Sequence, residues 1–299
     1  MNRNLEPEPD INKTLDINKT KAWLLDLDGV IWRGSRYIER SIEALVKLQD
    51  SGRRLIFFTN NSFITIDELL SRLNVGDLKV QKEDILTSSM AACRLLNPRD
   101  KVFYIGGDGI KQAIKDRGAF GSSVSDLISD RLSFNEINYN TVFDFIKQYG
   151  NNDRFKVVLV GLSFKISYLD VALAVNLIKN GSEFIATNND STYPVQLGLE
   201  IPGAGSAVAS IEYASSKKPV VAGKPNELAV ELIQSCIEND NLEMVVGDRY
   251  STDGKLAEAL NTKFGFVASG VKENPKDYKI ATSYSCIDLF ELVDKVLGL

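Results

Sequence analysis

The chain contains no histidine among its 299 residues. This absence excludes a Ser-His-Asp or Cys-His mechanism, a histidine-ligated metal site and a phosphohistidine intermediate within this chain. Acid–base catalysis would therefore have to use carboxylates, lysine, tyrosine or cysteine. The absence does not exclude a metal that prefers oxygen ligands, such as Mg²⁺. Each aspartate that follows a predicted strand thus becomes a candidate for chemistry.

Several other features are scarce. The 3 cysteines, Cys93, Cys236 and Cys286, form neither a Cys-x-x-Cys pair nor an evident disulfide framework, which is typical of cytosolic proteins. No apolar run approaches the roughly 20 residues that span a bilayer, so we expect no membrane partner. The net charge is -5 and no run of Lys and Arg exceeds two residues, which disfavours a nucleic-acid partner.

The N-terminal segment is polar and lacks the apolar core of a secretory signal. We expect residues 1–20 to form a disordered tail, and the protein to be cytoplasmic. The whole chain is 44% hydrophobic and 25% charged, an ordinary globular composition that suits one large domain or two modest ones.

Short apolar runs alternate with helical patterns along the chain, which predicts an α/β fold with a doubly wound, mostly parallel sheet covered on both faces. Several runs are apolar throughout, as buried parallel strands are. The predicted strands are 23–27, 54–59, 101–106, 155–162, 183–187, 219–223, 243–247 and 264–269. The predicted helices are 39–52, 84–96, 168–181, 226–238 and 286–297.

Four of the predicted strands are followed by polar groups, and ligands bind beyond the carboxyl ends of parallel strands. Two other strands, at 101 and 155, end in GGDG and GLSF, a weaker signal. Residues 84–200 are therefore predicted to form an inserted domain, and residues 21–83 with 201–299 the core. The polar groups at the four strand ends are Asp26 and Asp28, 59-TNNS-62, Lys224, and Asp248 with Asp253.

The chemistry of these groups points to phosphoryl transfer. Four converging carboxylates would disfavour one another, whereas a divalent cation removes the conflict and prefers oxygen ligands. Lys224 adds a positive charge, and 59-TNNS-62 adds hydroxyl, amide and backbone N–H groups suited to phosphate. An aspartate nucleophile and a second carboxylate that protonates the leaving oxygen would complete such a site.

The motifs DLDGVIWRG, FFTNNS, VVAGKP and VVGDRYSTD, in this order, resemble the haloacid dehalogenase superfamily. The chain looks most like the branch of p-nitrophenylphosphatases, which includes phosphoglycolate and pyridoxal phosphate phosphatases and NagD-like nucleotide phosphatases. The segments 185-IATNNDSTYP-194 and 202-PGAGSAVASIE-212 are similar to the branch's cap exit and core re-entry. The resemblance covers nearly all of residues 21–299.

The resemblance implies a Mg²⁺-dependent phosphatase of small phosphorylated metabolites. Asp26 would be the nucleophile and Asp28 the general acid, then base. Mg²⁺ would be held by Asp26, the backbone carbonyl of Asp28 and Asp248, with Asp253 supporting the metal side from outside the ligands. Residues 84–200 would be a C2-type cap that shapes the substrate pocket and forms a homodimer. The phosphoryl group would be held by Thr59, Asn60, Asn61 and Lys224, with Tyr193 in the cap loop above the site.

Two positions depart from the family pattern and bear on the substrate. Ser163 stands where the family often has Asp, and Gly254 follows the last motif aspartate where an apolar residue is common. A phosphotransferase and a non-catalytic phosphometabolite-binding protein on the same fold are the alternatives. The Asp26/Asp28 pair disfavours mere binding, which needs no nucleophile, and a dehalogenase would not need Asp28.

Three further motifs have competing interpretations. The Cys-x5-Arg spacing of 93-CRLLNPR-99 matches cysteine phosphatases, but the glycine-rich cradle is missing and a buried cysteine is favoured. The stretch 203-GAGSAV-208 partly matches a dinucleotide motif but lacks the third glycine. We interpret 106-GGDG-109 as a strand-to-helix turn that could contact a ligand.

Overall fold

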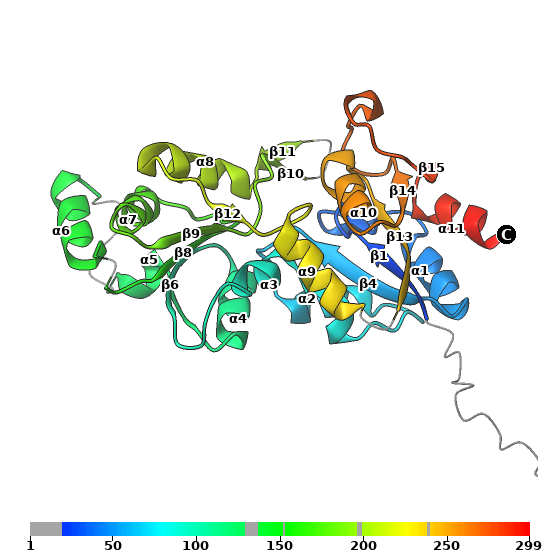
Figure 1. Ribbon diagram of the computed structural model, residues 1–299, viewed down its shortest axis with the longest axis horizontal. Helices are drawn as coiled ribbons and strands as arrows, with labels where there is room; N and C mark the ends of the chain where they lie inside the picture. The colour runs from blue at the N-terminus through cyan, green and yellow to red at the C-terminus, as the bar shows by residue number, and fades with distance from the viewer. Residues whose placement is uncertain (1–19, 129–136, 152, 196–198, 238–239) are drawn as a thin grey trace, which may run out of the picture.

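The computed structural model describes residues 20–128, 137–151, 153–195, 199–237 and 240–299, and the statements below refer to these residues. The predicted tail lies outside them except for Thr20. Two separate sheets of parallel strands lie along the long axis of the molecule, each with helices packed against it (Figure 1). This arrangement confirms the predicted doubly wound α/β fold. No helix of the described ranges is both long and apolar enough to cross a bilayer.

The first sheet has six parallel strands in the order β15-β14-β13-β1-β4-β5. In chain order this is the 3-2-1-4-5-6 arrangement of dinucleotide-binding folds, whose winding reverses between the first and fourth strands. That reversal falls between β1 and β13, where Leu24 pairs with Val245. A ligand site is expected beyond the carboxyl ends of these two strands. The bounds are β1 Lys21–Leu25, β4 Arg54–Thr59, β5 Ile85–Thr87, β13 Asn241–Gly247, β14 Lys263–Val267 and β15 Tyr284–Cys286.

Alternating side chains of β1 serve two apolar layers, because successive residues of a strand point to opposite faces. Trp23 and Leu25 pack against α1 (Ser41–Asp50), α2 (Ile66–Leu73) and α11 (Leu289–Leu297). Leu24 belongs to the opposite layer, with α3 (Ser88–Cys93), α9 (Glu227–Cys236) and α10 (Lys255–Ala259). Each layer covers one face of the sheet, so the sheet holds its strand ends on a rigid, buried base.

The second sheet has five parallel strands in the order β12-β9-β8-β6-β7, which is 2-1-3-4-5 in chain order and typical of flavodoxin-like folds. One face packs on α4 (Asp108–Asp116) and shares the apolar layer of α3 and α9, so this layer is continuous between the two sheets. The other face is covered by α6 (Tyr139–Tyr149), α7 (Tyr168–Lys179) and α8 (Ala204–Ser215). The bounds are β6 Lys101–Ile105, β7 Phe120–Ser122, β8 Val157–Val160, β9 Glu183–Ala186 and β12 Val220–Val221, with the short helix α5 at Val124–Leu127.

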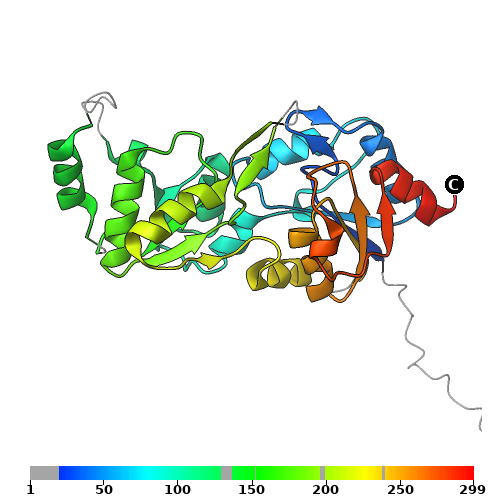
Figure 2. The same ribbon diagram turned by 90° about the horizontal axis from the view of Figure 1, so that it is seen from above.

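Two short hairpins lie between the sheets, one from each side. The strands β2 (Trp32–Arg33) and β3 (Arg36–Tyr37) form the first, and β10 (Thr192–Pro194) with β11 (Glu200–Pro202) forms the second. Seen from above, the β10–β11 hairpin bridges from the second sheet toward the first (Figure 2). It therefore brings residues of the inserted part of the chain over the carboxyl ends of β1 and β4.

The loop after β4 is held by both parts of the molecule. The backbone N–H of Leu162 donates to Ser62 Oγ at 3.2 Å, and that of Gly109 to the carbonyl of Phe63 at 3.0 Å. Phe63 also packs against Phe164, with ring centroids 4.7 Å apart and planes tilted by 50°. A Cβ on Gly109 would lie 2.3 Å from the carbonyl oxygen of Ile64, so only glycine allows this approach. Gly107 and Gly109 of 106-GGDG-109 thus make room for the loop.

The structure corrects one predicted helix and gives a basis for proposing other limits for the inserted domain. The helix expected over 84–96 begins only at Ser88, because Ile85–Thr87 pairs with β4 as β5 and Thr87 then caps α3 by accepting the Met90 N–H at 3.2 Å. Strand β12 pairs with β9 in the second sheet, although residues 201–299 were assigned to the core. From this sheet membership, we propose limits for the inserted domain near residues 88 and 221 instead of 84 and 200.

Candidate active site

A pocket opens at the winding reversal of the first sheet, between β1 and β13, and the second sheet closes it from the opposite side. The predicted catalytic, metal-binding and phosphoryl-binding residues all line this pocket, which is the arrangement expected at the carboxyl ends of parallel strands. The residues that line it are Asp26, Asp28, Thr59, Asn60, Asn61, Leu162, Asn188, Asp190, Thr192, Tyr193, Gly203, Ala204, Lys224, Asp248, Arg249, Thr252 and Asp253.

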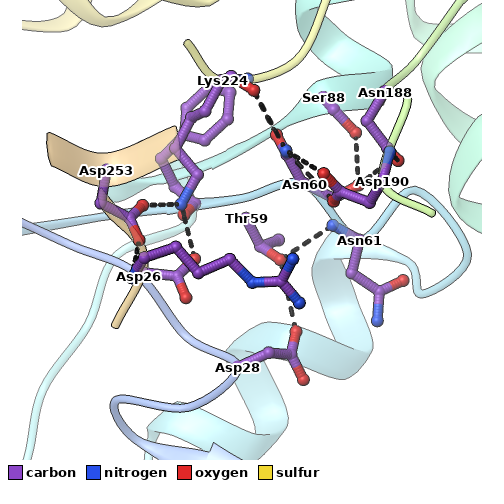
Figure 3. A network of polar contacts seen from close by, with 12 residues as sticks. Asp26, Asp28, Thr59, Asn60, Asn61, Ser88, Asn188, Asp190, Lys224 and Asp253 are labelled. Carbon is purple, nitrogen blue, oxygen red and sulfur yellow. Dashed lines mark hydrogen bonds and ion pairs between the residues drawn. The ribbon is translucent and has the colours of Figure 1, made fainter. Parts of the chain in front are cut away.

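Asp26 and Asp28 face the pocket together because the chain turns between them. The Asp26 N–H still donates to the Val246 carbonyl at 2.9 Å, continuing the ladder from β1 to β13. The chain then turns, with the Gly29 N–H donating to the Trp32 carbonyl at 2.7 Å. The turn brings the second carboxylate round to the side of the first, and Figure 3 shows both acids in the same network.

Lys224 is the central cation of the site. Its Nζ lies 2.6 Å from Asp26 Oδ1 and 2.7 Å from Asp253 Oδ1, and it donates to the Phe58 carbonyl at 3.2 Å (Figure 3). Burial lowers the pKa of Lys224, but Asp253 and Asp26 outweigh it and hold the pKa above its ordinary value. The lysine therefore stays charged, although only 3% of it is exposed.

Three buried carboxylates, Asp26, Asp248 and Asp253, have oxygens that all lie within 4.8 Å of one another. Burial raises the pKa of Asp26 well above its ordinary range and that of Asp248 to about 7, and the charge of Asp253 adds to both shifts. Lys224 ion-pairs with two of the three acids, so the cluster carries an excess of negative charge once all three acids are ionised. Excess negative charge on oxygen donors is the chemistry that Mg²⁺ or Ca²⁺ binds.

The oxygens of the three acids are not equally available. Asp253 gives Oδ1 to Lys224 and Oδ2 to the Arg249 N–H at 3.2 Å. Asp248 accepts the Val271 N–H at 2.6 Å on Oδ2, and within the described ranges nothing donates to its Oδ1. Asp26 Oδ2 is likewise without a donor there, while Oδ1 meets Lys224. The residues therefore fit a divalent cation, with Asp26 and Asp248 as the open donors and Asp253 in support.

Glycines make space for the acids. A Cβ on Gly270 would lie 1.9 Å from Asp248 Oδ2, and one on Gly29 would lie 2.5 Å from the same atom. Gly29 also has φ +94, a conformation that side chains rarely adopt. On the other side, a Cβ on Gly247 would lie 2.1 Å from Asp253 Cγ. The acid cluster can therefore form only while these positions lack side chains.

Asp28 has surroundings different from those of Asp26. Trp32 Nε1 and the Tyr193 hydroxyl both donate to Oδ1 at 3.2 Å, and the Thr59 hydroxyl lies 3.5 Å from Oδ2. Burial raises the pKa of Asp28, while the hydrogen bonds from Tyr193 and Trp32 oppose the rise. Asp28 makes no ion pair with Lys224, so the two aspartates are chemically distinct.

The side chains of residues 59–61 line the pocket and also hold neighbouring segments together. Thr59 Oγ1 accepts the Asn61 N–H at 3.0 Å, and Asn61 Nδ2 donates to the Tyr193 hydroxyl at 3.3 Å. Asn60 Oδ1 accepts the Lys224 N–H at 2.8 Å, and its amide lies 3.3 Å from Asp190 Oδ2. The Asn60 side chain thus ties three segments together, a use that differs from the phosphate contact expected of it.

Sequence reasoning missed two charged residues of the pocket, Asp190 and Arg249. Both lie inside motifs quoted above, but their facing positions depend on the packing of two distant loops. Burial raises the pKa of Asp190, and Arg249 opposes the rise. Among the described residues, no hydrogen bond or ion pair reaches the Arg249 guanidinium, which stays half-buried at the pocket wall. This guanidinium is available for an anion.

The remaining motifs have structural roles. Cys93 is buried, and burial raises its pKa to about 12, so it is a neutral thiol and no nucleophile at neutral pH. In 203-GAGSAV-208, a Cβ on Gly203 would lie 2.3 Å from the Asp190 carbonyl oxygen, so this glycine serves close packing. Ser163 Oγ accepts the Lys165 N–H at 3.3 Å, and Gly254 is buried against Ile280 and Phe264.

Comparison with known proteins identifies the family. Residues 23–119 match the haloacid dehalogenase-like hydrolases. A 5′-nucleotidase of Bacillus subtilis is 32% identical over 237 residues, which cover 78% of this chain and 81% of that protein. The chain belongs to the haloacid dehalogenase-like hydrolases. This confirms the resemblance that four short motifs had suggested.

Two further relatives of this hydrolase extend the likeness to nearly the whole chain. A 4-nitrophenylphosphatase of Schizosaccharomyces pombe is 26% identical over 93% of this chain and 95% of its own length. The structure of glycerol phosphate phosphatase from Mycobacterium tuberculosis, in complex with magnesium, superimposes with a TM-score of 0.72. It is 26% identical and covers 92% of this chain and 76% of its own.

Proposed function

We propose that this haloacid dehalogenase-like hydrolase is a Mg²⁺-dependent phosphatase of small phosphomonoesters. The observation that carries the proposal is the pairing of two unlike aspartates at one strand end. Asp26 contacts a lysine and has two further acids within 4.8 Å, whereas Asp28 faces three neutral donors. A carboxyl group beside a lysine and a metal site suits nucleophilic attack, and a separate carboxyl suits proton transfer.

The reaction proceeds in two steps. An Asp26 oxygen attacks phosphorus, the bond from phosphorus to the leaving oxygen breaks, and Asp28 gives that oxygen a proton to release the alcohol. Asp28, now a carboxylate, takes a proton from water as the water oxygen attacks the phosphoaspartate. The bond from phosphorus to Asp26 then breaks and inorganic phosphate leaves. The same acid thus serves both steps, because the first step leaves it in the form that the second requires.

Asp26 and Asp248, with the backbone carbonyl of Asp28, would hold Mg²⁺, and Asp253 would support them. When bound, Mg²⁺ neutralises negative charge on the phosphoryl oxygens and the acids. Lys224 holds Asp26 in place, and Thr59 and Asn61 border the phosphoryl position. Arg249 offers its unpaired guanidinium to the substrate anion, since its planar N–H fork matches phosphate and carboxylate.

The Asp26→Asn variant tests this function. We expect hydrolysis of 4-nitrophenyl phosphate to fall by more than about 1,000-fold, because the amide cannot form the phosphoaspartate. Retained turnover would refute the assignment. A phosphotransferase uses the same groups, and product analysis with a competing alcohol separates the two reactions. Two predictions from the sequence stay predictions: that the protein is cytoplasmic, and that it forms a homodimer through residues 84–200.

A further inference from the structure

The two oxygens of Asp28 receive unequal numbers of donors. Oδ1 accepts two hydrogen bonds, from Trp32 Nε1 and the Tyr193 hydroxyl, each at 3.2 Å. Oδ2 has only the Thr59 hydroxyl, at 3.5 Å. The carboxyl group is therefore fixed in rotation, with one oxygen bonded to two donors and the other turned toward Thr59.

The direction of the bond from Tyr193 follows from its neighbours. An indole N–H can only donate, so the Trp32 bond is fixed in direction. The Tyr193 oxygen accepts the Asn61 Nδ2 donor at 3.3 Å, which leaves the phenolic proton for Asp28. Two donors on Oδ1 leave the acid proton to Oδ2, the oxygen on the side of Thr59, which borders the proposed phosphoryl position.

We infer that Tyr193, on the β10–β11 hairpin, is a positioning residue that aims the acidic proton of Asp28 at the leaving oxygen. This inference rests on the proposed function, because it assigns a partner to the acid of that reaction. Tyr193 belongs to the inserted part of the chain, and Asp28 to the core. The acid is therefore complete only when the hairpin sits over the carboxyl end of β1.

The sequence predicted a different role, in which Tyr193 binds substrate. The two roles differ in what the hydroxyl does. A substrate contact changes KM for every ester alike, whereas an acid-positioning contact matters only when the leaving oxygen needs a proton. Phenolate is a poor leaving group and needs the proton, while 4-nitrophenolate leaves without it.

The test compares kcat/KM of the Mg²⁺-loaded enzyme for phenyl phosphate and 4-nitrophenyl phosphate, which nearly share a shape. The value of kcat/KM depends on the steps from substrate binding to loss of the leaving group. The later hydrolysis of the phosphoaspartate therefore does not affect it. For Tyr193→Phe we expect a loss of roughly 10-fold with phenyl phosphate and a change within about 2-fold with 4-nitrophenyl phosphate. Equal losses with both esters, or no loss with either, would overturn the inference.

Two controls sharpen the result. Tyr149→Phe removes a hydroxyl on α6 that donates to the Leu127 carbonyl at 3.0 Å, far from the carboxyl end of β1 (Figure 1), and should leave the ratio of the two esters unchanged. In an Asp28→Ala background, Tyr193→Phe should cost phenyl phosphate nothing more, because the two residues act as a unit. An additional loss of roughly 10-fold there would show that Tyr193 acts without Asp28.

The outcome for the unmodified enzyme separates this inference from the proposed function. If the unmodified enzyme with Mg²⁺ hydrolyses neither ester, the proposed function fails and the inference falls with it. If the enzyme hydrolyses both esters and Tyr193→Phe leaves their ratio unchanged, the function stands and only the inference fails. The melting temperature of each variant, measured alongside, shows that the chain has folded.

Discussion

Lys224 Nζ lies 2.6 Å from Asp26 Oδ1, although 198 residues separate the two in the chain. The contact joins the segment after β12 to the end of β1, so it fixes the returning chain against the first strand. Both side chains are buried, and a buried charge that loses its partner is costly. Lys224 therefore holds the fold together as well as the site.

We expect Lys224→Met to lower the free energy of unfolding by about 3 kcal/mol or more, because it leaves two neighbouring acids without their cation. Chemical denaturation without added metal at neutral pH measures this loss. Lys218→Met, at a mostly exposed position of the same approach segment, is the matched control and should change stability little. Equal stability of the Lys224 variant and the unmodified chain would contradict the buried ion-pair network.

Mg²⁺ should stabilise the protein more at pH 8 than at pH 5.5. Burial raises the pKa of Asp248 to about 7, above its ordinary value of 3.8. Such a group contributes stability below its unfolded pKa, and this contribution is lost as the pH rises through its folded pKa. The metal-free protein therefore loses stability between about pH 4 and pH 7, while Mg²⁺ competes best once the proton has left.

Thermal unfolding with and without Mg²⁺ at the two pH values checks this prediction. A free Mg²⁺ concentration of 100 times the dissociation constant raises the free energy of unfolding by about 2.7 kcal/mol. Asp248→Asn should remove most of the increase at pH 8 and leave the melting temperature without metal equal or higher, since a buried negative charge is gone. A Mg²⁺ effect that is the same at both pH values would contradict the role of Asp248.

Gly29 and Gly52 form a matched pair for testing the space around the metal ligands. Both have positive φ, +94 and +81, so alanine costs about 1–2 kcal/mol at either position. Only at Gly29 would the new Cβ collide with Asp248, whereas nothing lies within 4 Å of a Cβ at Gly52. We expect Gly29→Ala to abolish stabilisation by Mg²⁺ and most hydrolysis, and Gly52→Ala to lower only the melting temperature.

Arg249 should bind the substrate anion. Among the described residues, its guanidinium has acids nearby but makes no hydrogen bond or ion pair, and Arg249→Gln removes the charge with little change in length. We expect KM for 4-nitrophenyl phosphate to rise about 10-fold, since a hydrogen bond to a charged group contributes roughly 1.5–3 kcal/mol. Arg249→Lys keeps the charge without the planar fork and should give an intermediate KM. A KM that is unchanged in both variants would show that the guanidinium only balances Asp190.

The sequence predicted most of the site because its residues share one simple property, a place directly after a buried strand. Asp26, Thr59 and Lys224 could be read in this way, since the carboxyl ends of parallel strands meet at one edge. What could not be read depends on the packing of loops. Asp190 and Arg249 come near each other only because the loop after β9 and the loop after β13 meet at the pocket, and no periodic pattern encodes that approach.

The longer strands could also be predicted from the sequence, because they are buried apolar runs. Long runs such as 54–59 and 155–162 bury both faces and were predicted as strands, and both contain strands of the sheets. The short segment 85–87 was assigned to a helix, because its three residues carry no periodicity of their own. Pairing with β4 decides its conformation, and such tertiary contacts override local preference.

The loop after β4 has a consequence for making chimeras. Ser62 and Phe63 accept hydrogen bonds from backbone N–H groups of the inserted domain. A Cβ at glycine 107, 109 or 161 of that domain would collide with the loop. Exchanging residues 88–221 alone between relatives would set a foreign surface against this loop. Carrying residues 60–66 along with the transplanted segment keeps the interlocking partners matched. The unit that can be swapped is thus larger than the domain that the chain connections suggest.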